Sequence, residues 1–230
     1  MNEGDASPTP VTFLFDVDNT LLDNDRVAAD LQCHLVSEIG AKGAREYWQI
    51  FEQLRTELGY ADYLGALQRY RDKHPRAPHL LCVSDFFINY PFGDRLFPDA
   101  IKVIDHVQQW GPAVILSDGD VVFQPLKVGR SGLANAVAGR VLIYVHKEQE
   151  LDNVEQRYPA EHYVLIDDKL RILAAVKKTW GTRVTTVFVR QGHYALDPQI
   201  VANCPAADIS IEHIADLLRY QLPELLTRKS

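Results

Sequence analysis

The sequence predicts an α/β protein with a doubly wound parallel sheet and a helical unit inserted after the first strand. Three observations support this. The apolar run at residues 11–15 ends abruptly in acidic residues, helical periodicity fills residues 24–90, and apolar strands alternate with helices from residue 97 onward. Such alternation is typical of parallel sheets with right-handed crossovers. We therefore expect a core domain from residues 1–23 and 91–230, and a helical subdomain from residues 24–90.

The first predicted strand, residues 11–15, is apolar on both faces, as buried parallel strands are. Asp16, Asp18 and Thr20 follow it directly. Parallel sheets bind ligands at the carboxyl ends of their strands, so these side chains should lie where chemistry occurs. Two carboxylates there repel each other unless a cation or a proton is present. Mg2+, which prefers carboxylate oxygens, suits that position.

The inserted block is predicted to be helical throughout. Apolar residues recur at helical spacing within residues 27–39, 47–58 and 63–70, and a fourth apolar segment covers residues 80–88. Gly40 and Gly59 are expected to end the first two helices, and Pro75 the third. A block of this length exceeds an ordinary loop, so we expect a small subdomain.

The remaining chain alternates between the two element types. Strands are predicted at residues 113–116, 141–145, 163–166 and 185–189, and helices at residues 98–111, 121–133, 151–158, 170–179 and 211–218. Pro98 begins the first of these helices and Gly111 ends it, which are the usual positions for these two residue types.

Composition limits the function classes. The 230 residues are 47% hydrophobic and carry a net charge of -7, which suits a soluble protein and disfavours binding to nucleic acid or anionic membranes. No apolar run approaches the roughly 20 residues of a membrane helix. The first ten residues are expected to form a loose tail without signal-peptide features. Cys33, Cys82 and Cys204 are odd in number and far apart, so we expect buried free thiols and a reducing, cytoplasmic setting.

Three later predicted strands also end in polar side chains. These are Ser117 and Asp118 after the first, His146 and Lys147 after the second, and Asp167, Asp168 and Lys169 after the third. Each group alone is compatible with a surface turn or a solvated side chain. Because the ends of parallel strands meet at one edge of a sheet, their agreement in position favours a single polar site.

The motifs resemble those of the haloacid dehalogenase (HAD) superfamily of hydrolases. Asp16, Asp18 and Thr20 match its first motif, Ser117 its second, Lys147 its third, and the pair Asp167 and Asp168 its fourth. Lys127, inside a predicted helix, and Lys169, which begins one, are alternatives for the third motif, because no proline follows Lys147. The resemblance spans residues 11–22 and 97 to the end. It implies a Rossmann-like core with a helical C1-type cap.

The resemblance also implies a role for each residue. Asp16 would be the nucleophile that forms an aspartyl-phosphate, and Asp18 would protonate the leaving group and then activate water. Thr20, Ser117 and the backbone N–H near Asp118 would bind phosphate oxygens, and Lys147 would neutralise charge. Mg2+ would be held by Asp16, by the backbone carbonyl of Asp18 and by Asp167, with Asp168 behind them.

The predicted function is a Mg2+-dependent phosphatase acting on a small phosphorylated metabolite. A 2-haloacid dehalogenase using Asp16 is an alternative, but the resemblance implies that dehalogenating members lack the second aspartate and need no Mg2+. A catalytically idle protein that binds phosphate or a partner is another. The cap residues considered for substrate choice are Arg26, Arg45, Trp48, Phe87 and Asn89. The eight histidines show no zinc-ligand spacing, no nucleotide-binding glycine motif occurs, and nothing decides the oligomeric state.

Overall fold

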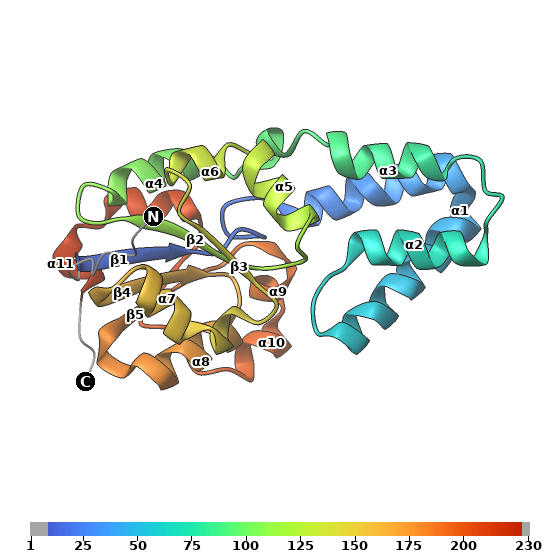
Figure 1. The fold of residues 1–230 in the computed structure, drawn as a ribbon. Coiled ribbons are helices and arrows are strands. Elements are labelled where there is room, and N and C mark those ends of the chain that lie inside the picture. Colours follow the sequence, from blue (N-terminus) through green and yellow to red (C-terminus); the bar gives the residue numbers. More distant parts are fainter. Residues whose placement is uncertain (1–8, 227–230) are drawn as a thin grey trace.

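The computed structural model describes residues 9–226, which form a parallel sheet in the order β3-β2-β1-β4-β5-β6 (Figure 1). The strands are β1 (Thr9–Phe15), β2 (Ala113–Asp118), β3 (Val141–Tyr144), β4 (Ala160–Asp167), β5 (Val184–Val189) and β6 (Ile209–Ile211). Chain order reverses on either side of β1, as in a doubly wound fold. Residues 1–8 of the predicted tail lie outside the described residues, and Thr9 and Pro10 already belong to β1.

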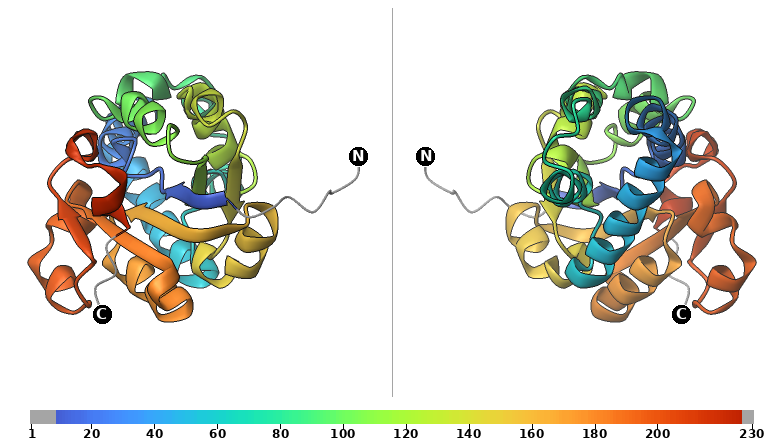
Figure 2. Two further views of the ribbon diagram at one scale, coloured as in Figure 1. Left: turned by 90° about the vertical axis from the view of Figure 1, so that its left-hand side faces the viewer. Right: turned by 90° about the vertical axis from the view of Figure 1, so that its right-hand side faces the viewer.

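Helices cover both faces of the sheet, which is why its central strands are apolar on both sides. One face packs against α4 (Ala100–Val107), α6 (Leu133–Ala136), η4 (Ile214–Arg219) and α11 (Leu222–Leu225), and the other against α7 (Leu151–Arg157) and α8 (Leu170–Trp180). Along β1, Phe13 and Phe15 point into the first layer and Leu14 into the second. Figure 2 shows these layers from two sides, with green helices over one face and orange helices over the other.

The cap consists of α1 (Asn24–Leu58), α2 (Tyr63–Lys73) and α3 (Leu80–Asn89), and it lies beyond the carboxyl ends of the strands (Figure 1). The backbone of α1 leaves the helical conformation at Gly40, with φ 73° and ψ 164°, so two helical segments meet there. Gly59 ends α1 with φ 81°, and its N–H donates to the carbonyl of Arg55. Both glycines adopt a positive φ that other residues rarely tolerate, and both lie where the sequence predicted an end.

The later elements differ from prediction in several places. The helix predicted at residues 98–111 is shorter, as α4 begins at Ala100 and ends at Val107. The helix predicted at residues 121–133 ends earlier, as α5 (Phe123–Arg130), because the chain turns at Gly132 with φ 86° before α6. The helix predicted at residues 211–218 begins only at Ile214 and is a 3-10 helix, η4, because Ile209 and Ile211 pair with β5 as part of β6. Strand pairing outweighs the local helical pattern there. The short elements η1 (Phe92–Arg95), η2 (Lys147–Gln149), η3 (Gly181–Arg183), α9 (Gly192–Leu196) and α10 (Pro198–Ala202) complete the described chain.

Four aromatic side chains join the cap to the core, and we call them the aromatic bridge: Tyr63, Phe87, Phe92 and Phe123. The ring centroid of Phe123 lies 5.3 Å from that of Tyr63, 5.4 Å from that of Phe87 and 5.6 Å from that of Phe92. All four are buried within the cluster that also includes Phe13 and Phe15 of β1. The apolar core is therefore continuous from the sheet into the cap.

The cysteines correct one expectation. Cys33 and Cys82 are exposed and Cys204 is half-buried, and all three thiols are free. On α1 the buried positions near Cys33 are Leu31 and Leu35, so Cys33 points to the opposite, solvent-facing side of that helix. None of the described helices is long and apolar enough to cross a membrane.

Candidate active site

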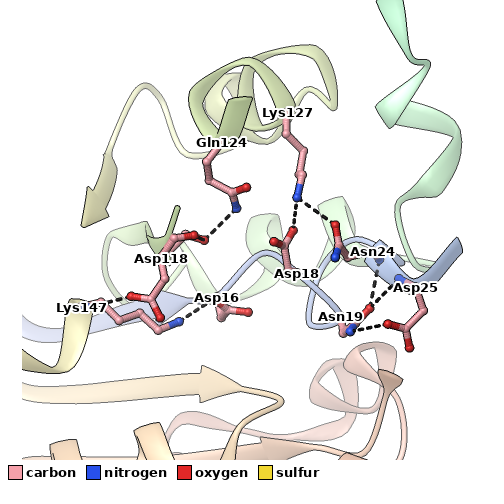
Figure 3. Close-up of polar contacts among 10 residues, drawn as sticks. Asp16, Asp18, Asn19, Asn24, Asp25, Asp118, Gln124, Lys127 and Lys147 are labelled. Atoms are coloured by element: carbon pink, nitrogen blue, oxygen red, sulfur yellow. Dashed lines mark hydrogen bonds and ion pairs between the residues drawn. The ribbon is translucent and has the colours of Figure 1, made fainter. Parts of the chain in front are cut away.

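The carboxyl ends of β1, β2 and β4 meet at the start of η2 around a buried lysine. The Lys147 Nζ donates to Asp16 Oδ1 at 2.5 Å (Figure 3). It also donates to the carbonyl of Leu116 at 3.2 Å and pairs with Asp167 Oδ2 at 2.7 Å. Its backbone N–H donates to Asp118 Oδ1 at 2.7 Å. The chain bends after β3, at residues 145–146, and this bend places Lys147 beside the carboxyl ends of β1, β2 and β4.

Electrostatics keep Lys147 charged. Burial alone would lower the pKa of Lys147, but the charges of Asp16 and Asp167 outweigh it and raise that pKa. Burial raises the pKa of Asp167, while Lys147 opposes the rise. Burial also raises the pKa of Asp168 well above its usual range, with Lys169 opposing it. Burial thus disfavours the ionised forms of Asp167 and Asp168, and a cation beside them would stabilise those forms.

Asp16, Asp167 and Asp168 form a buried acidic cluster whose oxygens lie within 4.8 Å of one another. Within the described residues, Asp16 Oδ2 and both carboxylate oxygens of Asp168 have no hydrogen-bond partner. Buried carboxylate oxygens without partners are costly, and clustered hard oxygen donors are the ligands that Mg2+ takes. The cluster thus fits the predicted metal site. The carboxylate of Asp18 lies outside it, so only the backbone carbonyl could take part as predicted.

A second buried lysine holds Asp18. The Lys127 Nζ, on α5, donates to Asp18 Oδ1 at 2.6 Å and to Asn24 Oδ1 at 2.9 Å (Figure 3). The Lys127 side chain is only 1% exposed, against 25% for Asp18. Asn24 begins α1, so this contact also ties the core to the root of the cap.

The structure brings all three candidate lysines to the site, each beside a different carboxylate. Lys147 contacts Asp16, Lys127 contacts Asp18, and the charge of Asp168 raises the pKa of Lys169 despite its burial. With Asp118 and Asp167 included, five carboxylates face three ammonium groups. If all are ionised, two negative charges remain, which is the charge that one divalent cation neutralises.

The predicted phosphate-binding hydroxyls lie beside these groups. Thr20 is fully buried, and its Oγ1 has no hydrogen-bond partner among residues 9–226. Ser117 Oγ accepts from Gln124 Nε2 at 2.9 Å and donates to the carbonyl of Asp118 at 3.3 Å. The sequence patterns do not single out Gln124, although a polar residue one position after Phe123, on the buried side of α5, is a usable signal.

The loop between Asp16 and the cap is fixed by Asn19. Its Oδ1 accepts the N–H groups of Asn24 and Asp25 at 3.0 and 3.1 Å, which caps α1, and its φ is 61°. Its Nδ2 donates to Asp25 Oδ1, which also pairs with the His193 ring at 2.6 Å. Gly192 packs so closely that a Cβ there would lie 2.4 Å from Asn19 Cβ. The start of α1 is therefore held by the loop after β1, through Asn19, and by the segment after β5, through His193.

A cavity of about 670 Å³ lies between cap and core. The cap lines it with Trp48, Phe51 and Tyr63, and the core with Asp18 and Asp118 among others. Of the five cap residues considered from the sequence, Trp48 lines this cavity. The other four are outside its lining: Arg26 pairs with Asp30, Phe87 belongs to the aromatic bridge, Asn89 bonds Asp85, and Arg45 lies on α1.

Comparisons with known proteins agree with this architecture. No family model and no curated protein matches the chain. Among solved structures, a protein of Burkholderia xenovorans LB400 described as a haloacid dehalogenase-like hydrolase is 60% identical, with a TM-score of 0.89, over 93% of this chain and 100% of that one. The magnesium-bound HAD-hydrolase YfnB of Bacillus subtilis is 18% identical, with a TM-score of 0.59, over 92% and 98%. An L-2-haloacid dehalogenase of Xanthobacter autotrophicus with chloropropionic acid covalently bound is 18% identical, with a TM-score of 0.58, over 90% and 96%. The last two show likeness of fold.

Proposed function

Because the chain belongs to the haloacid dehalogenase superfamily of hydrolases, we propose that it is a Mg2+-dependent phosphatase of small phosphorylated metabolites. One observation carries the proposal. The acidic cluster of Asp16, Asp167 and Asp168 has unpartnered oxygens, and a second acid, Asp18, lines the cavity beside it. A metal-free displacement of halide needs neither feature.

In the first step, Asp16 Oδ attacks phosphorus, the bond to the leaving oxygen breaks, and an aspartyl-phosphate forms. Asp18 delivers a proton to the leaving oxygen, so the alcohol departs neutral. Thr20 Oγ1, which is buried and unpartnered among the described residues, donates to a phosphate oxygen. Lys147, held charged between Asp16 and Asp167, stabilises the negative charge of the transferring group.

In the second step, water hydrolyses the aspartyl-phosphate. Asp18, now a carboxylate, takes a proton from that water, and inorganic phosphate leaves with Asp16 regenerated. The Lys127 ammonium donates to Asp18 Oδ1 at 2.6 Å, which orients the Asp18 side chain and leaves its other oxygen to carry the proton. The acidic cluster would hold Mg2+, which supplies positive charge to the phosphate oxygens when bound.

The cavity narrows the substrate class. Its cap wall is aromatic, formed by Trp48, Phe51 and Tyr63, while Asp25 and Glu52 add negative charge to its lining. The lining holds five acidic residues against three cations, Arg55, Lys169 and Arg171. Two of these cations are already paired, Arg55 with Glu52 at 3.4 Å and Arg171 with Glu148 at 3.2 Å. We expect a leaving group with a flat or apolar portion and without a second anionic group, since such a group would face like charges.

A 2-haloacid dehalogenase is the second candidate. It is favoured by the likeness of fold to the Xanthobacter enzyme and by the Lys127 contact, which occupies one oxygen of Asp18. In that reaction Asp16 displaces halide from carbon, and the resulting ester is hydrolysed. An idle protein that binds phosphate is the third candidate.

The experiment is phosphate release from an aryl phosphate by the purified protein with Mg2+, with chelator, and in the variant Asp16→Asn. Activity that requires both Mg2+ and Asp16 supports the phosphatase. Halide release from 2-chloropropionate that persists with chelator supports the dehalogenase instead. Binding of a phosphate analogue without turnover of either compound supports the idle protein. The cytoplasmic setting is part of the proposal and is supported by the three free thiols.

A further inference from the structure

Two cap helices place three chemically different side chains together, far from the cluster described above. Glu38 comes from α1, His79 is the residue before α3, and Cys82 is in the first turn of α3. Their ligand atoms all lie within 4.8 Å of one another. His79 Nδ1 is 3.3 Å from Glu38 Oε2. The cluster therefore spans the contact between α1 and α3.

We propose that Glu38, His79 and Cys82 bind a transition-metal ion of the Zn2+ type. Imidazole nitrogen, thiolate sulfur and carboxylate oxygen are the three protein donors that Zn2+ takes, whereas Mg2+ and Ca2+ avoid sulfur and nitrogen. The acidic cluster in the core offers oxygen alone. The two sites should therefore select different metals.

The helix geometry supports this donor set. His79 and Cys82 are three residues apart at the start of α3, a spacing that puts two side chains on one face. Glu38 approaches them from the facing helix. Three protein ligands leave a fourth tetrahedral position for water.

His34 steadies the arrangement. It lies one turn before Glu38 on α1, and its Nε2 donates to the carbonyl of Cys82 at 3.1 Å. Its ring stacks on Phe86 with centroids 5.1 Å apart. These contacts hold the first turn of α3 against α1, so the three donors are positioned by groups outside the set.

The cluster is open to solvent, so an ion can reach it directly. The His79 side chain is 58% exposed and that of Glu38 is 23% exposed, and Cys82 is exposed as well. The eight histidines show no zinc-ligand spacing in the sequence, and Glu38 and His79 are far apart in the chain. The antiparallel packing of α1 and α3 brings them together. A bound ion would cross-link the two helices just before the kink at Gly40.

The test is a Co2+ titration of the metal-free, full-length protein in excess Mg2+, which occupies oxygen-only sites. Thiolate ligation gives an intense sulfur-to-cobalt charge-transfer band that the core carboxylates cannot produce. We expect this band to saturate at one Co2+ per chain and to disappear on addition of Zn2+. It requires no enzymatic activity, so it is independent of the proposed phosphatase reaction.

Variants assign the ligands. Cys82→Ser should abolish the band, and His79→Ala should weaken Co2+ binding by about tenfold or more. Cys33→Ser is the matched control, because Cys33, on α1, is an exposed thiol like Cys82 on α3. This variant should leave the band unchanged. Zn2+ should also protect Cys82, but not Cys33, from alkylation measured by mass spectrometry.

The proposal is overturned if saturating Co2+ gives no charge-transfer band in wild-type protein, or if the band survives Cys82→Ser. Equal alkylation of Cys82 with and without Zn2+ would also overturn it, and the cluster would then be an interhelix ion pair beside a surface thiol. Circular dichroism of the metal-free variants, expected to match wild type, separates lost binding from lost folding.

Discussion

Replacing Lys127 by methionine removes the ammonium beside Asp18 while keeping most of the volume of the side chain. The variant leaves Asp18 Oδ1 and Asn24 Oδ1 without their donor at 2.6 and 2.9 Å. Methionine fills the buried space, so packing changes little. Any loss of stability or activity in this variant therefore measures the contribution of the charged contact.

The size of the expected stability loss follows from how deeply Lys127 and Asp18 are buried. Removing one partner of a fully buried pair costs about 3–5 kcal/mol, and an exposed pair contributes roughly 0.2–1 kcal/mol. Lys127 is 1% exposed and Asp18 is 25% exposed, so the pair lies between these limits. We expect a loss of about 1.5–3 kcal/mol in the free energy of unfolding, the range for hydrogen bonds to charged groups. A similar loss in the transition state lowers kcat/KM by about 10- to 100-fold.

The assay combines urea unfolding with steady-state hydrolysis of an aryl phosphate in Mg2+. Lys102→Met is the matched control, because the Lys102 side chain is 75% exposed and pairs with Asp99 at 2.7 Å on the surface. It should change stability by less than about 0.5 kcal/mol. A double-mutant cycle with Asp18→Asn isolates the contact, because Lys127→Met should cost less once the charge of Asp18 is gone.

Unchanged urea unfolding and unchanged kcat/KM in Lys127→Met would refute this reasoning. So would equal effects of Lys127→Met in the wild-type and Asp18→Asn backgrounds, since the contact would then contribute nothing. A loss of stability with full activity would show that Lys127 serves folding alone.

Three further outcomes are expected. Gln124→Leu removes the bond to Ser117 and should raise KM for phosphate esters with a loss of about 1 kcal/mol in unfolding free energy, checked by kinetics and urea unfolding. Burial raises the pKa of Asp168 in the native protein, so the metal-free protein should lose stability as pH rises from the unfolded pKa of about 3.9 through the native value. Thermal unfolding in chelator should show that Asp168→Asn removes this loss and that Mg2+ offsets it in wild type. Gly192→Ala, at φ 72° and against Asn19, should lower the melting temperature, which calorimetry measures; an unchanged value would contradict the close contact.

Much of the fold could be predicted because buried parallel strands are apolar on both faces and helices between them carry a regular apolar stripe. β1 and β4 are long enough to show this pattern clearly. β6 has three residues at the edge of the sheet, too few to outweigh the helical pattern that follows. The predicted domain limits at residues 23/24 and 90/91 stay a prediction.

The residues of the site also fall into those that could be predicted from the sequence and those that could not. Strand ends converge by topology, so Asp16, Ser117 and Asp167 could be placed together from chain order alone. Lys127 and Gln124 lie on a helix, and what they contact depends on the rotation of α5 about its axis, which a sequence pattern fixes only coarsely. The roles of all these residues in catalysis stay predictions.

The aromatic bridge has a consequence for how such a protein can be rearranged. Phe92 and Phe123 belong to the α/β core in sequence, yet they pack against Tyr63 and Phe87 of the inserted helices. Exchanging only residues 24–90 for the cap of a relative would leave these rings facing an unmatched surface. A transplanted cap should fold well only if its recipient carries matching side chains at Phe92 and Phe123. Cap and core are therefore expected to unfold in one transition, and to diversify as a pair.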